Sequence, residues 1–263
     1  MKIQSLIIGI ILLAFASYPA AQAGENDFQI AIGEEFQYKV SWSFIRLGTL
    51  KLEVADTVRM DGTLLYHLKL NMDSNPVLFF VNIHSVYETF IDEMLRVHLF
   101  YANERIDNIL YKTEYRFDYV SKLIHINMTD IKNPSNTIID TQPLSHQALF
   151  DGTGMVFYAR ANAHKTEADT LTAYFEAKYG KVSINFKGKK GAQKIDALQK
   201  PMPTYFIDGE VHMKAIAGLS GPFKGWFVID SQRPPLIAEL KVFIGSVKVE
   251  LEDWRGWNHP GVK

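Results

Sequence analysis

The sequence contains no cysteine among its 263 residues. This absence excludes disulfide bonds, thiolate zinc sites, a cysteine nucleophile and the acylated cysteine that begins a bacterial lipoprotein. An excess of one charge is also lacking, because 28 lysines and arginines face 29 aspartates and glutamates. Such a balance gives no net attraction to nucleic acid or to anionic lipid. After the first apolar run, no other approaches the length of about 18 residues that a membrane span needs, so we expect a soluble mature chain without a transmembrane segment.

The first 23 residues have the layout of a cleaved signal peptide. Lys2 supplies the positive charge, an apolar run follows from Leu6 to Ala16, and Ala21-Gln22-Ala23 places small residues before Gly24. We expect cleavage after Ala23 and export to the periplasm. A signal anchor is the alternative, but the apolar run is short for a bilayer span and polar residues follow it.

Apolar and polar residues alternate along most of the remaining chain, which is the pattern of antiparallel strands with one buried face. Phe36, Tyr38, Val40 and Trp42 alternate with polar residues and are expected to face one interior. The pattern resumes after Gly48, so this region is either a hairpin or one strand bent at a glycine bulge. Further alternating runs cover residues 64–72, 111–119, 124–128, 182–186, 211–215, 240–244 and 247–251, with turns expected at Asp61-Gly62 and Gly245-Ser246.

Two segments depart from this alternation. Residues 77–81 are continuously apolar and predict either a buried turn of helix or a core strand. Residues 149–163 predict a short helix with Asp151 as its N-cap. The fold class expected is therefore all-β: a strongly bent antiparallel sheet or an open β-barrel with one or two short helices. A single β-rich domain over residues 24–263 is favoured because no flexible linker interrupts it, and two halves meeting near residue 140 are the alternative.

Three segments resemble a known family. They are Gly33 to Trp42 with Arg46 to Thr49, Ser85 to Asp92, and the closing stretch from Val228 to Leu251. Together they are similar to the domain of unknown function 3108 family over roughly Gly33 to Trp254. The resemblance implies an exported, largely antiparallel β protein. It implies no established reaction and transfers no catalytic residue.

Motifs for catalysis or metal binding find little support. The eight histidines show no chelating spacing, and His67, His125 and His212 fall on polar strand faces where solvation is expected. The acidic cluster of Glu88, Asp92 and Glu93 matches no calcium loop and is also expected to be solvated. Asp151-Gly152-Thr153-Gly154 has the Asp-Thr-Gly order of an aspartic protease loop after one inserted glycine, but no second copy exists, which favours the N-cap interpretation. We therefore expect no cofactor, no metal and no catalytic residue.

Two groups of residues are candidates for binding. The aromatic content is high, with 17 Phe, 12 Tyr and 4 Trp, and a concave sheet face could present some of these rings to an apolar or glycan ligand. The candidates are Trp42, Tyr66, Tyr115 and Phe117, and filling the core is the alternative for them. The second group is the basic stretch of Lys187, Lys189 and Lys190, continued to Lys194, which is interpreted as a hairpin tip. It is either a turn kept soluble by lysines or a contact for an anionic lipid or glycan.

The function that these features favour is a non-catalytic periplasmic protein. It would bind or scaffold an envelope lipid, a glycan or an envelope protein partner, and it would not bind nucleic acid. An envelope-polymer hydrolase with a dispersed active site is the alternative.

Overall fold

The computed structural model describes residues 28–78, 82–106, 109–213, 220–241 and 245–257. The expected signal peptide and its cleavage site therefore lie outside the described residues. Within these ranges the chain forms fourteen strands, one α-helix, α1 (Gly152–Asn162), and one 3-10 turn, η1 (Pro134–Asn136). The strands that precede the helix are β1 (Glu35–Trp42), β2 (Ile45–Met60), β3 (Thr63–Ser74), β4 (Ile83–Ile91), β5 (Val97–Ile106), β6 (Ile109–Asp118), β7 (Leu123–Asp130) and β8 (Ile138–Pro143). Those that follow it are β9 (Ala168–Phe175), β10 (Lys178–Gln193), β11 (Met202–Val211), β12 (Gly221–Val228), β13 (Pro235–Lys241) and β14 (Ser246–Arg255).

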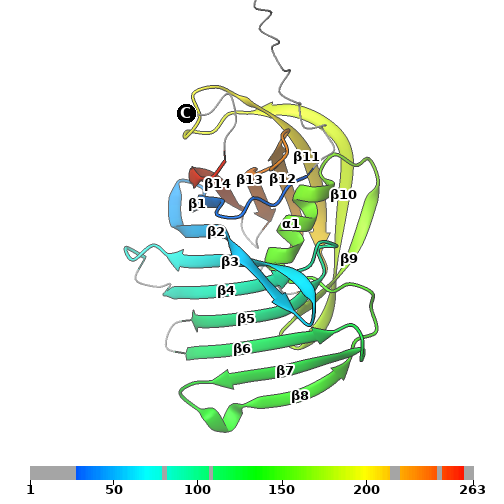
Figure 1. Cartoon of the computed structure of the whole chain (residues 1–263). Helices are drawn as coiled ribbons and strands as arrows, with labels where there is room; N and C mark the ends of the chain where they lie inside the picture. Colours follow the sequence, from blue (N-terminus) through cyan, green and yellow to red (C-terminus); the bar gives the residue numbers. More distant parts are fainter. Residues whose placement is uncertain (1–27, 79–81, 107–108, 214–219, 242–244, 258–263) are drawn as a thin grey trace, which may run out of the picture.

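All fourteen strands belong to one antiparallel sheet in the order β8-β7-β6-β5-β4-β3-β2-β1-β14-β13-β12-β11-β10-β9. Neighbours are consecutive in the chain except at β1 and β14, where the first strand pairs with the last. Figure 1 shows the sheet curling around α1. The expected all-β fold with a strongly bent antiparallel sheet is confirmed, as is the hairpin between β1 and β2.

The sheet is not closed into a barrel, because β8 and β9 do not pair with each other. Side chains link the two edges instead. The Tyr179 hydroxyl donates to the Pro143 carbonyl oxygen at 2.5 Å, and the Tyr174 hydroxyl donates to the Gln142 side-chain oxygen at 2.8 Å. Phe150, just before the helix, forms an isolated parallel bridge with Ala173 of β9. The chain leading into α1 therefore lies against the open edge of the sheet.

Helix α1 lies inside the curve and is packed on two sides. Phe157 belongs to the larger hydrophobic core, which β1 to β7 line, together with β13 and β14. Ala159 belongs to a second core that it shares with β9 to β12. Asp151 is the N-cap, as expected, with its Oδ1 accepting from the Gly154 amide at 2.8 Å. Its Oδ2 accepts from the Thr89 hydroxyl at 2.5 Å, so the cap also joins the helix to β4.

A buried ion pair holds the other end of the helix. Arg160 and Glu34 are 0% and 1% exposed, and Nη1 of Arg160 lies 2.6 Å from Oε1 of Glu34. Arg160 also donates through Nε and Nη2 to the Gln232 carbonyl oxygen at 3.0 and 2.7 Å. Arg233, likewise 0% exposed, donates to the carbonyl oxygens of Arg160 and Ala161. These contacts fix α1 to the segment before β1 and to the connection between β12 and β13.

Trp42 does not share the environment of the aromatic residues before it in β1. Phe36 and Tyr38 are 0% and 5% exposed, whereas Trp42 is 37% exposed. The pairing of β1 with β2 shifts register after Val40, and β1 ends at Trp42. This side chain therefore lies at the end of the strand, past the residues that cover the core. The expectation of one shared interior is confirmed for Phe36 and Tyr38 and wrong for Trp42.

The acidic cluster also differs from expectation. Asp92, expected to be solvated, is 3% exposed and organises the turn between β4 and β5. Its carboxylate accepts from the backbone amides of Met94 and Arg96, from the Arg96 guanidinium and from His98 Nε2. Burial by itself would raise the pKa of Asp92, but these hydrogen bonds outweigh it and lower the pKa to about 2. Glu88 is half-buried and lies 2.7 Å from His67.

Of the three histidines expected to be solvated, His67 is not. Its ring stacks on Phe90 and lies between the carboxylates of Asp56 and Glu88, and its side chain is 12% exposed. The other two histidines, His125 and His212, are exposed.

The apolar run at 77–81 begins in a turn rather than in a helix or a core strand. Val77 is 80% exposed. Residues 79–81 lie outside the described residues.

We predict a large difference between two aromatic truncations in β1. Phe36→Ala should lower the free energy of unfolding by on the order of 3–5 kcal/mol, because it leaves a cavity in the core. Trp42→Ala should cost about 1 kcal/mol or less, since that side chain is already over a third exposed. Urea denaturation followed by circular dichroism measures both, and equal losses would contradict the register described above.

A second prediction concerns acid stability. Because the folded pKa of Asp92 is about 2 rather than the usual 3.8, its ionised form stabilises the fold above about pH 4. That contribution, about 2 kcal/mol, is lost as the pH falls towards 2. Asp92→Asn should therefore be less stable than wild type at pH 7, with the difference shrinking between pH 4 and pH 2. Asp61→Asn, in an exposed ion pair with Arg116, is the control and should change little at either pH.

Candidate functional site

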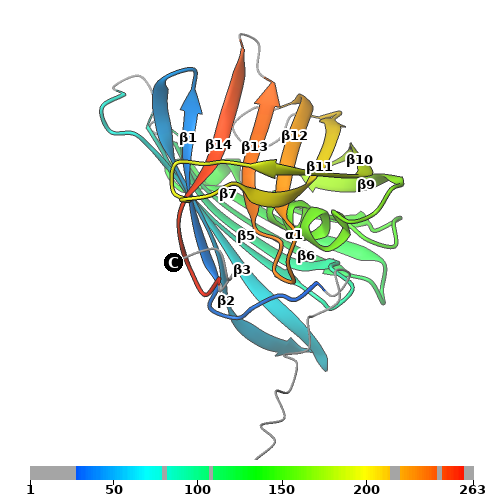
Figure 2. The ribbon, with the colours of Figure 1, turned by 90° about the horizontal axis from the view of Figure 1, so that it is seen from above.

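An apolar cavity of about 570 Å³ opens on the concave side of the sheet. Its walls come from both halves of the chain, from β1 to β4 on one side and from β9 to β14 on the other, and α1 forms part of its lining. Figure 2 shows the helix lying between these two groups of strands. We call this space the apolar cavity.

The lining of the apolar cavity is mostly aliphatic. Leucine, isoleucine, valine and methionine side chains predominate, and they fall on the inward-facing positions of their strands. Examples are Val40, Leu50, Met72, Ile184, Val211, Leu240, Val247 and Val249, with Met155, Val156 and Ala159 from the helix. Aromatic rings contribute at Phe150, Tyr174, Phe175, Phe223 and Phe227. Phe223 covers Gly209 of the neighbouring strand, where a Cβ atom would lie 2.5 Å from the Phe223 ring. The glycine therefore lets this ring lie against the sheet.

Charged residues of the lining are engaged by other protein groups. Asp73 Oδ1 lies 2.8 Å from His84 Nδ1, and Lys224 Nζ lies 3.7 Å from a Glu239 carboxylate oxygen. Asp151 is occupied as the helix N-cap, and its burial raises its pKa despite the hydrogen bonds that it accepts. The two carboxylates of the lining, Asp73 and Asp151, therefore each have a structural partner.

Two hydroxyl groups of the lining are different. The side-chain oxygens of Tyr38 and Thr153 are buried and make no hydrogen bond among the described residues. The two residues are 5% and 1% exposed. Burial raises the pKa of Tyr38 far above its usual value, so its hydroxyl stays protonated and can donate. Buried hydroxyl groups rarely lack a partner, because desolvation then costs free energy with no compensation. Both residues line the apolar cavity, but the two oxygens are themselves covered by protein atoms, so a ligand could reach them only by displacing neighbouring side chains.

The four aromatic candidates do not line the apolar cavity. Tyr115 and Phe117 are 2% and 3% exposed and pack with Phe100 and Tyr174 in the core. The Tyr115 hydroxyl accepts from the Ala177 amide at 3.0 Å. Tyr66 is partly buried against the same core, and Trp42 lies at the strand end.

The basic stretch is not a hairpin tip. Lys187, Lys189 and Lys190 lie within β10, which continues to Gln193. The pairing of β10 with β11 shifts register between Phe186 and Lys189, and Gly188 adopts a positive φ of 56° at this bulge. The bulge turns the lysines outward, because the extra residues break the alternation there. Lys187 pairs with Asp208 at 2.5 Å, Lys189 lies 5.4 Å from the centre of the Phe206 ring, and Lys190 lies 5.7 Å from that of Tyr205.

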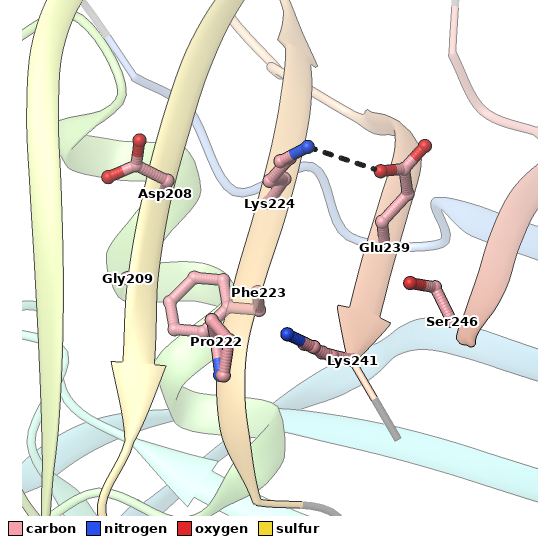
Figure 3. Close-up of a pocket in the computed structure, with 8 residues that line it drawn as sticks. All are labelled: Asp208, Gly209, Pro222, Phe223, Lys224, Glu239, Lys241 and Ser246. Atoms are coloured by element: carbon pink, nitrogen blue, oxygen red, sulfur yellow. Dashed lines mark ion pairs between the residues drawn. The ribbon is translucent and has the colours of Figure 1, made fainter. Parts of the chain in front are cut away.

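A second hollow, of about 350 Å³, lies between β11 and β14 and is shown in Figure 3. Asp208, Lys224 and Glu239 lie opposite one another on successive strands. Their charges alternate in sign, and Figure 3 marks the ion pair between Lys224 and Glu239. Because these charges compensate one another, this hollow is a weaker candidate for a ligand site than the apolar cavity.

In the described part of the chain, no group of three or more histidine, aspartate or glutamate side chains is placed to hold a metal ion. No helix in that part is both long and apolar enough to span a bilayer.

Known proteins resemble this chain in sequence family and in fold. The crystal structure of a beta-barrel-like protein of domain of unknown function DUF1849 from Brucella abortus matches with a TM-score of 0.56 at 10% identity, over 88% of this chain and 100% of that one. A protein from Bacteroides fragilis described as exported, with a YmcC-like fold, matches with a TM-score of 0.34 at 9% identity, over 87% of this chain and 98% of that one. No curated protein matches the sequence. The model of the family described as protein of unknown function (DUF3108) matches residues 37–252, and the chain belongs to that family.

Proposed function

We propose that this protein is an exported, non-catalytic binding protein that holds the apolar chain of an envelope lipid in the apolar cavity. The observation that carries the proposal is the aliphatic lining of a cavity of about 570 Å³ on the concave face of the sheet. This volume lies within the range of roughly 300–1,000 Å³ that is typical of small-ligand pockets. An aliphatic wall favours a lipid over a glycan, because sugar hydroxyl groups buried there would lose their hydrogen bonds to water.

The two hydroxyl groups without partners give the ligand an orientation. Tyr38 and Thr153 lie on β1 and at the start of α1, and both line the apolar cavity. A ligand with a carbonyl or carboxyl group would accept a hydrogen bond from the Tyr38 hydroxyl while its hydrocarbon contacts the strands. The ligand class proposed is therefore an acyl chain with an oxygen acceptor at one end.

The cellular location that we propose for this function comes from the sequence. We propose that the chain is cleaved after Ala23, that residues 24–263 act in the periplasm as one β-rich domain, and that the ligand is a component of the cell envelope. The support is the order of charged, apolar and small residues at the N-terminus.

Filling the apolar cavity should abolish binding. In wild type, a saturated fatty acid should raise the melting temperature, with about 1.4 kcal/mol of stabilisation for each tenfold rise in free ligand above its Kd. Ala238 of β13 lines the cavity and lies opposite Val249 of β14, so Ala238→Phe places a ring in the space. This variant should show no ligand-dependent shift. Differential scanning fluorimetry over a range of fatty acid concentrations measures the effect.

Glu239→Phe is the matched control, because it adds a ring at the next residue of the same strand, which faces the other side of the sheet. It should keep the ligand-dependent shift. A shift of equal size in wild type, Ala238→Phe and Glu239→Phe would show that the fatty acid binds elsewhere, and no shift in wild type would refute the proposed function.

Removing the Tyr38 hydroxyl should separate polar recognition from apolar binding. Tyr38→Phe keeps the ring and deletes the donor, so binding of a fatty acid should weaken by roughly two- to tenfold. Binding of an alkane of similar length, which has no acceptor, should stay unchanged or become slightly tighter. Isothermal titration calorimetry with both ligands tests this, and an equal loss for both would assign Tyr38 a packing role only.

A further inference from the structure

Described residues of three chain connections lie at one end of the apolar cavity. They are Ser43 and Phe44 between β1 and β2, Asn75 to Leu78 after β3, and Gly245 before β14. The residues that flank them line the cavity, namely Val40, Leu47, Met72, Ser74, Leu78, Leu240 and Val247. Figure 2 shows the end of β1, the start of β14 and the end of β13 side by side at the top of the view. They form the border of the cavity at that end.

The three connections contact one another. The Asn75 backbone amide donates to the Leu47 carbonyl oxygen at 2.7 Å, and its side-chain amide donates to the Arg46 carbonyl oxygen at 3.0 Å. Gly245 lies against Trp42, since a Cβ atom at this glycine would be 3.2 Å from the indole nitrogen. The border is therefore held together as one structure.

This border exposes large apolar side chains. Phe44 is 92% exposed, Val77 is 80% exposed and Trp42 is 37% exposed. We call these three residues the apolar rim. A single exposed apolar residue needs no explanation, but here three lie at two adjoining turns at the end of an apolar cavity.

We propose that the apolar rim docks on the surface of a lipid bilayer and brings the end of the apolar cavity against the acyl chains. This inference rests on the proposed function, because a lipid ligand has to leave or enter a membrane at some point. The rim side chains come from two neighbouring turns, with Trp42 and Phe44 at the turn between β1 and β2 and Val77 in the turn after β3, and they project where lipid headgroups could surround them. Trp and Phe are also side chains that favour the membrane interface.

The charges near the rim favour a dependence on apolar contact rather than on lipid charge. Arg46 forms two hydrogen bonds with the Glu252 carboxylate at 2.7 and 2.8 Å. Because the Arg46 charge is compensated within the protein, this described part of the rim offers no free cation, so docking should need no anionic lipid and should be weakly sensitive to salt.

Vesicle flotation of the mature chain tests the proposal. Wild type should float with vesicles of phosphatidylcholine, and adding phosphatidylglycerol should change the bound fraction little. The double variant Phe44→Ser/Val77→Ser should reduce partitioning by at least about tenfold, since it removes the two most exposed apolar groups of the rim. The matched control is Met94→Ser/Val120→Ser, which removes apolar side chains that are 71% and 96% exposed on turns at the opposite end of the sheet. This control should float like wild type.

A labelled cysteine supplies a second readout, since the chain has no cysteine of its own. Ser43→Cys, next to Phe44, should carry an environment-sensitive fluorophore into the bilayer and shift its emission to the blue when vesicles are added. Ser121→Cys, in the exposed turn between β6 and β7, should show no shift.

The outcomes separate the two proposals. Failure of wild type to float, or equal flotation of wild type and Phe44→Ser/Val77→Ser, would overturn docking by the rim and would leave the apolar cavity intact as a ligand site. Fatty acid binding in solution is measured on the same double variant and should be unchanged. Rim-dependent flotation by a protein that binds no fatty acid in solution would instead refute the proposed function and keep the docking surface.

Discussion

The ion pair between Glu34 and Arg160 is buried among the rings of Phe28, Phe36 and Phe157, with Arg160 within 5.4 Å of each ring centre. A buried charge without its partner is strongly unfavourable, so each of the two residues constrains where the other can be. Glu34 precedes β1, and Arg160 lies in the last turn of α1. The pair therefore ties the last turn of the helix to the start of β1, on the concave side of the sheet that the apolar cavity occupies.

Much of the fold follows from local pattern. Alternation places Tyr115 and Phe117 on the buried side of β6, and the N-cap role of Asp151 follows from its position before a helical segment. The alternation of apolar and polar residues does not show where along a strand the core ends. For this reason Trp42 was expected to be buried with Phe36 and Tyr38. The alternating pattern also fails at a bulge. The lysines expected at a hairpin tip lie within β10, beside the bulge that Gly188 and the register shift form.

The apolar cavity could not be predicted residue by residue. The residues that line it, such as Leu50, Val247 and Val249, have the same alternating pattern as residues of a filled core. Whether such a face is covered depends on the curvature of the whole sheet and on contacts between distant segments, such as Glu34 with Arg160. Of the aromatic candidates, Tyr115 and Phe117 lie in the core, while aliphatic side chains form most of the cavity wall.

The pairing of β1 with β14 has a consequence for how the protein reaches its native state. Every other ladder of the sheet joins strands that follow each other in the chain, and such hairpins have low contact order. The β1–β14 ladder closes a loop of nearly the whole chain, and the entropy of that closure has to be overcome before its contacts stabilise anything. The two walls of the apolar cavity meet across this ladder, so the cavity is complete only after the last strand has been added. Partly folded chains therefore lack it.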